Sequence, residues 1–381
     1  RYVSIRYTGI TVEANSELQG LTVGCVGSGT TIEYVESFNS DDDGFEFFGG
    51  TVNCKYLVSA FNSDDAFDYD QGFRGKGQFW FVLQSDVLGN RAGEYDSGDK
   101  GALSASPKSN PQLWNCTYLG SGPNSANAKN DFALIYKEHA GGGHYNSIFA
   151  DFRDKAIQIE DVDGADARER LEAGELKLEN NIWFRTAGDD LNAIVDQDFV
   201  RTYLAANNNY VVNPSLRGVS RTNDGNLDPR PNIGAHPYFQ QRKDYPAGDP
   251  FFEQVDYIGA FGDDQWLTGW TALSMIGIAG ELTATDVEVV SSTASDYSLS
   301  QNYPNPFNPS TTIEFSVPAR SDVTIDVYNA LGQNVATVVD GQYAAGSYSV
   351  IFDASSLPSG VYMYTLKSGS TTIAKQMILS K

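Results

Sequence analysis

Two neighbouring segments decide the fold, VESFNSDDDGFEF at residues 35–47 and VSAFNSDDAFDY at residues 58–69. The motif FNSDD begins at Phe38 in the first segment and at Phe61 in the second, an offset of 23 residues. The aromatic and acidic residues after the motif match at an offset of 22. A weaker third copy covers residues 81–96. Tandem units of this length indicate a repeat architecture, because one unit alone cannot bury its apolar side chains.

The repeat extends through residues 1–185, where strand-like runs alternate with glycine-rich or polar turns at intervals of about 22–34 residues. This pattern favours an all-β fold, a right-handed parallel β-helix of about seven coils, each of which packs its inward side chains on the next coil. We expect helices at 166–174, as an insertion, and at 196–206, as a cap on one end. The prediction requires that Phe38 and Phe61 lie on successive coils.

Two further regions follow the repeats. Residues 186–275 lack a repeat period and indicate a capping region, because the end of a solenoid exposes apolar side chains and unpaired backbone. Residues 276–297, rich in Ser, Thr, Ala and acidic residues, indicate a linker. We expect five aromatic residues to cover the solenoid end, with a sugar-binding platform as the alternative: Phe251, Phe252, Tyr257, Trp266 and Trp270.

Residues 298–381 differ in both pattern and charge. Short alternating strands with turns every 8–12 residues or so predict a small antiparallel immunoglobulin-like β-sandwich. The module holds four basic and five acidic residues, so nearly all of the net charge of −23 lies on residues 1–297. That charge argues against a general nucleic-acid binder and against docking on an anionic membrane. No run approaches the ~18 apolar residues of a membrane span.

Three asparagines fall at equivalent places in the expected coils. Asn115, Asn146 and Asn180 occur in the strings NCT, NSI and NNI. We predict that their amides hydrogen-bond to one another along the coil axis, with three independent turn positions as the alternative. The three cysteines are too few, and odd in number, for a disulfide framework, so we expect small buried residues, with one disulfide and one free thiol as the alternative.

Acidic residues gather in the repeated motif. Residues 39–44 match the start of an EF-hand calcium loop, but Gly50 stands where that loop needs a glutamate, which excludes an EF-hand. Carboxylates about 5 Å apart on successive coils repel unless a cation or a proton intervenes. A solvated acidic edge, screened by salt, is the alternative. Ca²⁺ is the candidate cofactor, with six candidate ligands: Asp41, Asp43, Glu46, Asp64, Asp65 and Asp68.

Other candidate sites are weaker. Glu94 is expected to continue an acidic column, and residues 161–166 form a second calcium candidate. No nucleophile-elbow, phosphate-loop or zinc-protease motif occurs. His139 and His144 flank a glycine turn, where surface positions are favoured over a metal pair. Residues 153–155 (Arg-Asp-Lys) combine an acid with basic residues, as the sites of polysaccharide lyases and hydrolases on β-helices do. No catalytic residue is assigned, and a non-enzymatic protein is favoured over an enzyme.

The C-terminal module also contains several distinctive motifs in a fixed order. They are NYPNPFNPSTTI at 302–313, VYNALGQ at 327–333, LPSGVY at 357–362 and KQMILSK at 375–381. Through them the module resembles, over nearly its whole length, the type A C-terminal sorting domain of the type IX secretion system. The residues that carry the resemblance are Tyr303, Pro304, Asn305, Pro306, Gly332, Gly360, Lys375 and Lys381.

This resemblance implies a Bacteroidota-like bacterium and the type IX secretion machinery as a partner. It also implies delivery across both membranes to the outer cell surface or the medium, where such domains are often cleaved. The first segment resembles uncharacterised β-helix surface proteins of the same bacteria, for example at residues 2–7 and 43–50. In those relatives a matching coil or two precedes the Tyr2 strand, so we expect a segment before Arg1. That resemblance brings no known activity.

The sequence therefore favours a secreted or cell-surface, non-enzymatic β-helix protein. An adhesin, a surface-layer component and a subunit of an extracellular filament built from copies of itself all fit this description. The alternative is a carbohydrate-binding or polysaccharide-degrading β-helix protein, with a surface polysaccharide as its partner. A groove lined by aromatic residues and paired acids would favour the alternative.

Overall fold

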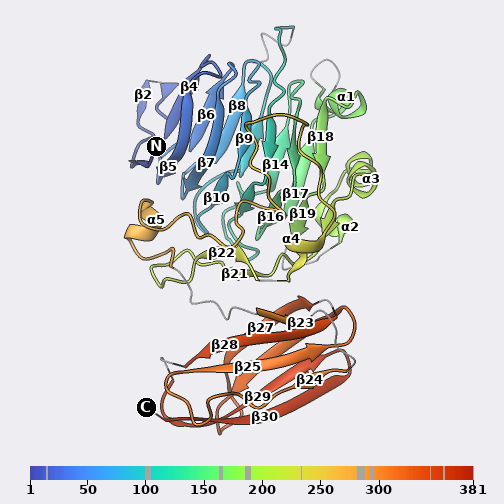
Figure 1. The fold of residues 1–381 in the computed structure, drawn as a ribbon. Coiled ribbons are helices and arrows are strands. Elements are labelled where there is room, and N and C mark those ends of the chain that lie inside the picture. The colour runs from blue at the N-terminus through green and yellow to red at the C-terminus, as the bar shows by residue number, and fades with distance from the viewer. Residues whose placement is uncertain are drawn as a thin grey trace. The chain divides into compact units, whose positions relative to one another are not determined.

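The computed structural model describes residues 1–13, 16–98, 104–162, 166–184, 190–232, 234–280, 288–291, 296–343, 345–354 and 357–380. The chain forms two compact units. One comprises Arg1–Pro214, Val219–Pro229 and Gln240–Gly280, and the other comprises Ser215–Gly218, Arg230–Phe239 and Glu281–Lys381. Figure 1 shows parallel strands in the first unit and an antiparallel sandwich in the second. Of the expected linker, residues 281–287 and 292–295 lie outside the described residues.

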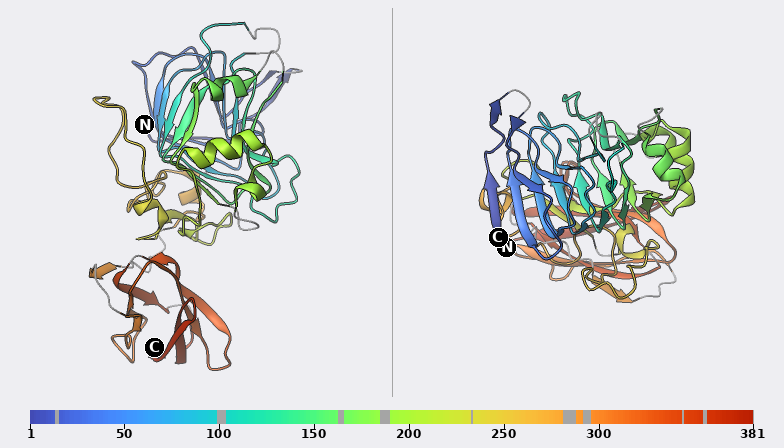
Figure 2. Two further views of the ribbon diagram at one scale, coloured as in Figure 1. Left: turned by 90° about the vertical axis from the view of Figure 1, so that its right-hand side faces the viewer. Right: turned by 90° about the horizontal axis from the view of Figure 1, so that it is seen from above.

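The first unit is a parallel β-helix, as the repeats predict. Its strands pair in parallel with strands about 22–41 positions away in sequence, and Figure 2 shows successive coils side by side. The larger sheet has twelve strands: β1 (Val3–Arg6), β5 (Thr31–Phe38), β7 (Asn53–Ala60), β9 (Lys76–Gln78), β10 (Phe81–Leu83), β12 (Gln112–Trp114), β13 (Thr117–Leu119), β15 (Gly142–Tyr145), β16 (Ile148–Ala150), β18 (Leu176–Glu179), β19 (Ile182–Phe184) and β20 (Tyr210–Val211).

A second sheet completes each coil. It contains β4 (Leu21–Gly24), β6 (Phe45–Phe48), β8 (Phe67–Asp70), β11 (Gly93–Tyr95), β14 (Phe132–Tyr136) and β17 (Lys155–Ile159). Two short pairs lie outside these sheets: antiparallel β2 (Thr11–Glu13) with β3 (Ser16–Glu17), and β21 (Leu216–Gly218) with β22 (Asp228–Pro231).

The larger sheet bends along one line of residues, the corner column, which comprises Tyr2, Tyr34, Tyr56, Phe79, Asn115, Asn146 and Asn180. Every member has a positive φ, between 50° and 60°. This left-handed conformation turns the backbone between two faces of the coil. Strand β7 spans the bend, so its first half pairs with β9 and its second half with β10. Beyond β7 the sheet divides into two rows of shorter strands.

Aromatic side chains fill the interior of the coils. The ring centroids of Phe45 and Phe67 lie 5.1 Å apart, and those of Phe67 and Trp80 lie 4.6 Å apart. Each such contact joins residues of successive coils, which is how a short repeat buries its apolar face. Cys54 and Cys116 are buried free thiols in this core, as expected, whereas Cys25 is exposed.

Helices close one end of the β-helix. α1 (Ala167–Glu172) and α3 (Asp198–Ala206) confirm the two helices predicted from sequence, and α2 (Leu191–Ile194) precedes α3. The short helices α4 (His236–Phe239) and α5 (Ala272–Met275) complete the helical content of the described residues. Val200 and Leu204 of α3 are fully buried in the same core as the coils. The apolar face of α3 therefore caps the final coil, which removes apolar surface from water.

Residues 240–280, here called the strap, run along the corner column rather than over the end of the solenoid. Trp270 packs edge-on against Tyr34, with ring centroids 5.9 Å apart, and Trp266 packs edge-on against Tyr56 at 5.3 Å. Phe252 is 4% exposed and clusters with Trp114. The expectation that the aromatic residues of the strap cover the solenoid end is therefore wrong, because α2 and α3 already close it.

The second unit contains an antiparallel β-sandwich, as predicted. One sheet holds β23 (Glu288–Ser291), β28 (Gly346–Asp353), β25 (Ser310–Val317) and β24 (Ser298–Leu299), and the other holds β27 (Asn334–Tyr343), β26 (Ser321–Tyr328), β29 (Gly360–Ser368) and β30 (Thr371–Leu379). Alternating residues of both sheets form one buried core that includes Ile313, Ile325 and Leu366. This alternation of buried and exposed residues matches the alternating pattern that predicts these strands from the sequence.

Candidate functional site

The register of the coils decides which carboxylates meet. Phe45 pairs with Phe67 after the acidic motif, and Phe38 pairs with Ala60 before it, so both flanks are offset by 22 residues. Phe38 and Phe61 do lie on successive coils, with ring centroids 5.7 Å apart. The FNSDD similarity is nevertheless one residue out of register, since Phe61 aligns with Asn39, and both have a positive φ.

This register brings Asp42 next to Asp64 and Asp43 next to Asp65. The backbone N–H of Asp65 donates to Oδ1 of Asp43 at 2.9 Å, and the N–H of Arg91 donates to Oδ1 of Asp65 at 2.6 Å. Each carboxylate therefore fixes the loop of the following coil. The sequence offset of 23 would have paired Asp41 with Asp64 instead, because sequence similarity ignores the hydrogen-bond ladder.

A close approach of neighbouring backbones holds the loop. A Cβ on Gly44 would lie only 2.3 Å from Oγ of Ser59 and 2.6 Å from the carbonyl oxygen of Ala66. Asn62 braces the same region, because its Oδ1 accepts from the N–H of Ser40 at 2.8 Å and its Nδ2 donates to Ser59 Oγ at 2.8 Å. The carboxylates of this loop thus project from a backbone with little freedom to move.

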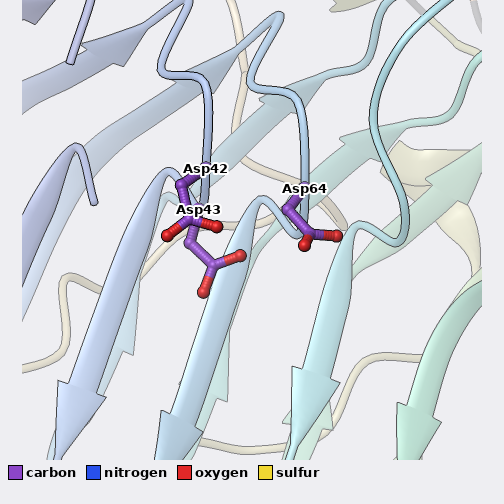
Figure 3. Close-up of side chains that lie close together, drawn as sticks. All are labelled: Asp42, Asp43 and Asp64. Atoms are coloured by element: carbon purple, nitrogen blue, oxygen red, sulfur yellow. The ribbon is translucent and has the colours of Figure 1, made fainter. Parts of the chain in front are cut away.

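Two overlapping groups of carboxylates result, and both contain Asp43. In each of the groups Asp42–Asp43–Asp64 and Asp43–Glu46–Asp68, one oxygen per residue lies within 4.8 Å of the others. Figure 3 shows Asp42 and Asp43 on one loop and Asp64 on the neighbouring one. We call Asp42, Asp43, Glu46, Asp64, Asp65 and Asp68 together the acid cluster.

Buried oxygens in the acid cluster lack hydrogen-bond donors. Oδ1 of Asp64 and Oδ1 of Asp68 are inaccessible to solvent and have no hydrogen-bond partner within the described chain. Buried polar atoms are normally hydrogen-bonded, and a buried charge needs a partner or a metal ion. Oxygen-only ligands from several carboxylates form the donor set that Ca²⁺ prefers. The residues present therefore fit a calcium ion.

The electrostatics of the acid cluster agree with this fit. Burial raises the pKa values of Asp43, Asp65 and Asp68 well above the usual range, and neighbouring carboxylates raise them further. The like charges that face Asp43 belong to Asp42, Asp64 and Glu46. A cation among these oxygens would reverse both effects, because it favours the charged form of each carboxyl group.

The acid cluster borders a second group on the same sheet. Glu46, Asp68 and Glu94 align on β6, β8 and β11, as the repeats predict. Nζ of Lys137 lies 2.8 Å from Glu94 and 3.3 Å from Asp96. Burial raises the pKa of Asp96 to about 7 against the opposing effect of Lys137. Burial would also raise the pKa of Glu94, but Lys137 and Arg91 lower it overall.

The six candidate ligands differ in their placement. Asp41 is exposed and belongs to neither group within 4.8 Å. Asp43, Glu46, Asp64 and Asp68 belong to the groups, and the buried Asp65 adjoins them. Asp42 replaces Asp41 in the site because the true offset is 22. Lys137 and Asp96 were missed, since only the pairing of Tyr95 with Tyr136 shows that they are neighbours.

The remaining candidates have structural partners. His144 is not at the surface, contrary to expectation: it lies in the core, Nδ1 is 2.8 Å from the hydroxyl of Tyr136, and burial lowers its pKa to about 3. Arg153 and Lys155 donate to the carbonyls of Ser125 and Ala193. In the loop at 161–166, residues 163–165 lie outside the described residues.

The three asparagines of the corner column do not bond to one another, so the predicted amide ladder is wrong. Their amides bind the strap instead. Nδ2 of Asn146 donates to the carbonyl of Lys243 at 2.9 Å, and its Oδ1 accepts from the N–H of Lys243 at 2.7 Å. Asn180 donates to the carbonyl of Gln241 at 2.8 Å. Positive φ turns these side chains outward, toward the strap rather than along the coil axis.

Comparison with known families agrees with this architecture. The sequence profile of the pectate-lyase-like β-helix domain matches residues 1–227, more than half of the chain. The chain belongs to this family. The profile of the secretion-system C-terminal sorting domain matches residues 301–380 and confirms the resemblance seen in the sequence. The protein is therefore a type IX secretion substrate that is exported to the cell surface or beyond.

Further comparisons add little to the β-helix and sorting-domain assignments. No curated protein matches the chain. The crystal structure of an engineered protein aligns with 76% of this chain at 12% identity and a TM-score of 0.17, which is too low to support any conclusion. This chain spans 64% of the length of that protein. Among the described residues, no helix combines the length and the apolar character needed to cross a membrane.

In the sorting domain, the NYPNPF motif covers the edge of β30. Oδ1 of Asn305 accepts from the N–H of Ile378, and the N–H of Phe307 donates to the carbonyl of Ile378, both at 2.9 Å. The motif thus occupies backbone groups that would otherwise form an open sheet edge. Tyr303 is 81% exposed although its backbone is paired with that of Thr312.

The other residues of the sorting motif have simpler placements. Gly332 adopts a positive φ of 77° in the turn between β26 and β27. Gly360 and Lys375 lie on β29 and β30, paired with Leu379 and Tyr364. Pro304 and Pro306 follow cis peptide bonds. Lys381 lies outside the described residues.

Proposed function

We propose that the protein is a non-enzymatic extracellular scaffold whose acid cluster binds Ca²⁺ after export. The observation that carries the proposal is the pair of carboxylate groups within 4.8 Å that share Asp43 and draw ligands from successive coils. A cation at this position joins the loops of two coils, which repel each other without it. Extracellular calcium modules operate with dissociation constants of about 10⁻⁴–10⁻³ M, so binding would follow release from the cell.

The role that we propose for the scaffold is that of an adhesin, a surface-layer component or a filament subunit. Export by the type IX system and a long stack of coils support this class of function. Repetitive β-helices offer extended, regular surfaces for such contacts. Electron microscopy and light scattering of the purified protein with calcium test the filament role. Linear polymers support the filament, and a monomer at high concentration removes it.

Thermal unfolding tests the calcium proposal. All five tryptophans lie between residues 80 and 270, so their fluorescence reports on the β-helix unit alone. At calcium 100-fold above the dissociation constant, the melting temperature should rise by roughly 5–10 °C over the value with chelator. Asp68→Asn should remove most of the rise, whereas Asp256→Asn, at an exposed position outside the cluster, should keep it. A melting temperature that chelator does not change contradicts the proposal.

The Glu94–Asp96–Lys137 group supports a second candidate, cleavage of an acidic polysaccharide. Glu94 has a lowered pKa and Asp96 a raised one, and opposed shifts of two carboxyl groups suit a general base and a general acid. Their position beside the acid cluster would let a cation bind an acidic sugar near them. A panel of acidic polysaccharides, assayed for reducing ends and unsaturated products with and without Ca²⁺, tests this function. Activity that Asp96→Asn abolishes supports it, and no product across the panel contradicts it.

A further inference from the structure

A separate hollow lies between the loops that follow β10 and β13. Its volume is about 410 Å³, and its lining includes Asp86 and Val87 from the first loop and Ser121 and Pro123 from the second. This volume falls in the range of about 300–1,000 Å³ that is typical of small-molecule sites. The hollow contains no residue of the acid cluster.

Arg221 forms one wall and is held firmly by three coils. Its Nε donates to the carbonyl of Gln84 at 2.8 Å, and its Nη2 bonds to the carbonyl of Gly120 and, at 2.6 Å, to Oδ2 of Asp151. These partners follow strands whose residues align in the ladder. Nη1 has no hydrogen bond within the described chain, and it lies 3.9 Å from the position that a Cβ on Gly122 would take; Gly122 also lines the hollow. The guanidinium therefore presents two N–H groups in a fixed direction.

Ser121 supplies a second polar group. The residue is 1% exposed, and its hydroxyl has no hydrogen-bond partner within the described chain. Buried hydroxyls without a partner are uncommon in native proteins. Ser121 lines the hollow, so rotation of its side chain would let this hydroxyl meet a hydroxyl group of a bound molecule, as donor or acceptor.

The charge of the hollow excludes anions as preferred ligands. Asp151 compensates the charge of Arg221, and Asp86 adds an exposed carboxylate to the lining. The rest of the wall is partly apolar, because Val87 is 65% exposed and Pro123 of the second loop also lines the hollow. This combination suits a neutral molecule that has both hydroxyl groups and an apolar C–H face.

We propose that this hollow binds a neutral pyranose sugar. Asp86 accepts hydrogen bonds from sugar hydroxyls, Arg221 Nη1 donates to a neighbouring hydroxyl, and Ser121 bonds to a third. Val87 and Pro123 pack against the C–H face of the ring. The site is a binding site only, and it is independent of calcium and of the Glu94–Asp96–Lys137 group.

Saturation-transfer NMR and calorimetry on the full chain test the proposal. The probes are glucose, galactose, mannose and N-acetylglucosamine, with galacturonate as the anionic comparison. We expect saturable binding of at least one neutral sugar, weakened about tenfold by Asp86→Asn and severalfold by Ser121→Ala. Asp264→Asn, at another exposed position, should not alter binding. Asp86 is exposed, so its replacement leaves the fold intact.

Three outcomes would overturn the proposal. The first is the absence of binding by every neutral probe at 50 mM or so, far above the millimolar range expected of single sugars. The second is binding that neither Asp86→Asn nor Ser121→Ala changes. The third is preference for galacturonate that increases in Asp86→Asn, because this result would identify an anion site around Arg221.

Discussion

The corner column and the acid cluster arise from the same stacking but place very different groups together. In the corner column, Tyr34 and Tyr56 stack with ring centroids 4.3 Å apart, and the asparagines bind the strap. In the acid cluster the same repeat distance brings carboxylates within 4.8 Å of one another. A parallel coil therefore places equivalent side chains of successive repeats next to one another, whether they attract or repel. Stacked rings, and asparagines that bind the strap, stabilise the fold, whereas stacked carboxylates require a cation or a proton.

The largest effect should come from the middle of the corner column. Tyr56 packs between Tyr34 and Phe79 and donates from its hydroxyl to Glu253. Tyr56→Ala should lower the free energy of unfolding by about 3 kcal/mol, because it removes two stacking contacts and opens a cavity. Urea denaturation followed by tryptophan fluorescence measures the change.

Tyr2 provides the matched control at the end of the same column. It is 61% exposed, stacks on Tyr34 on one side only, and meets Trp270 edge-on with ring centroids 6.0 Å apart. Tyr2→Ala should therefore cost only about 1 kcal/mol. Equal losses in the two variants would contradict the claim that stacking between coils stabilises the column.

The acid cluster and the neighbouring Asp96 should make the stability of the protein depend on pH. Raised pKa values of Asp43, Asp65, Asp68 and Asp96 mean that the folded chain binds more protons than the unfolded chain above about pH 4. In the presence of chelator, stability should therefore fall by roughly 2 kcal/mol as pH rises from 5 to 8. Unfolding in urea at several pH values measures this slope.

Calcium provides the control for the pH experiment. A bound cation lowers the carboxyl pKa values, so most of the loss of stability between pH 5 and 8 should disappear in excess Ca²⁺. If stability instead rises with pH in chelator, the negative charges of the carboxylates are already balanced by other groups of the folded protein.

The amide half of the corner column should give an intermediate effect. Asn146→Ala loses two hydrogen bonds to Lys243 and places alanine at a positive φ, so we expect a loss of about 2 kcal/mol. Asn180→Ala also places alanine at a positive φ but loses one bond to the strap instead of two, so it should cost less, about 1 kcal/mol. Thermal unfolding compares the two variants. A larger loss for Asn180 would indicate that the strap does not bind the column as described.

The smallest change in stability should come from an acidic residue that lies beside the acid cluster but outside it. Asp41 repeats in the motif but is exposed and outside both carboxylate groups. Asp41→Asn should change stability by less than about 0.5 kcal/mol, with or without calcium. The melting temperature of this variant should still rise with calcium. Loss of that rise would show that Asp41 belongs to the site.

The sequence was enough to predict the coils, the capping helix and the sandwich, because hydrophobic period and repeats follow directly from burial. Register was harder, since FNSDD aligns at 23 residues while the backbone ladder runs at 22. That single residue exchanges Asp41 for Asp42 in the site. The direction of the asparagine side chains depends on positive φ and on the strap, and neither is visible in a local motif.

Calcium titration by calorimetry tests the central claim most directly. The full chain at pH 7.5 should bind Ca²⁺ with a dissociation constant of about 10⁻⁴–10⁻³ M. Asp43→Asn should abolish this binding, because Asp43 belongs to both carboxylate groups, and Asp256→Asn should leave it unchanged. If wild-type protein takes up no calcium at 10 mM or so, or if Asp43→Asn binds it equally well, the stacked carboxylates do not form a calcium site.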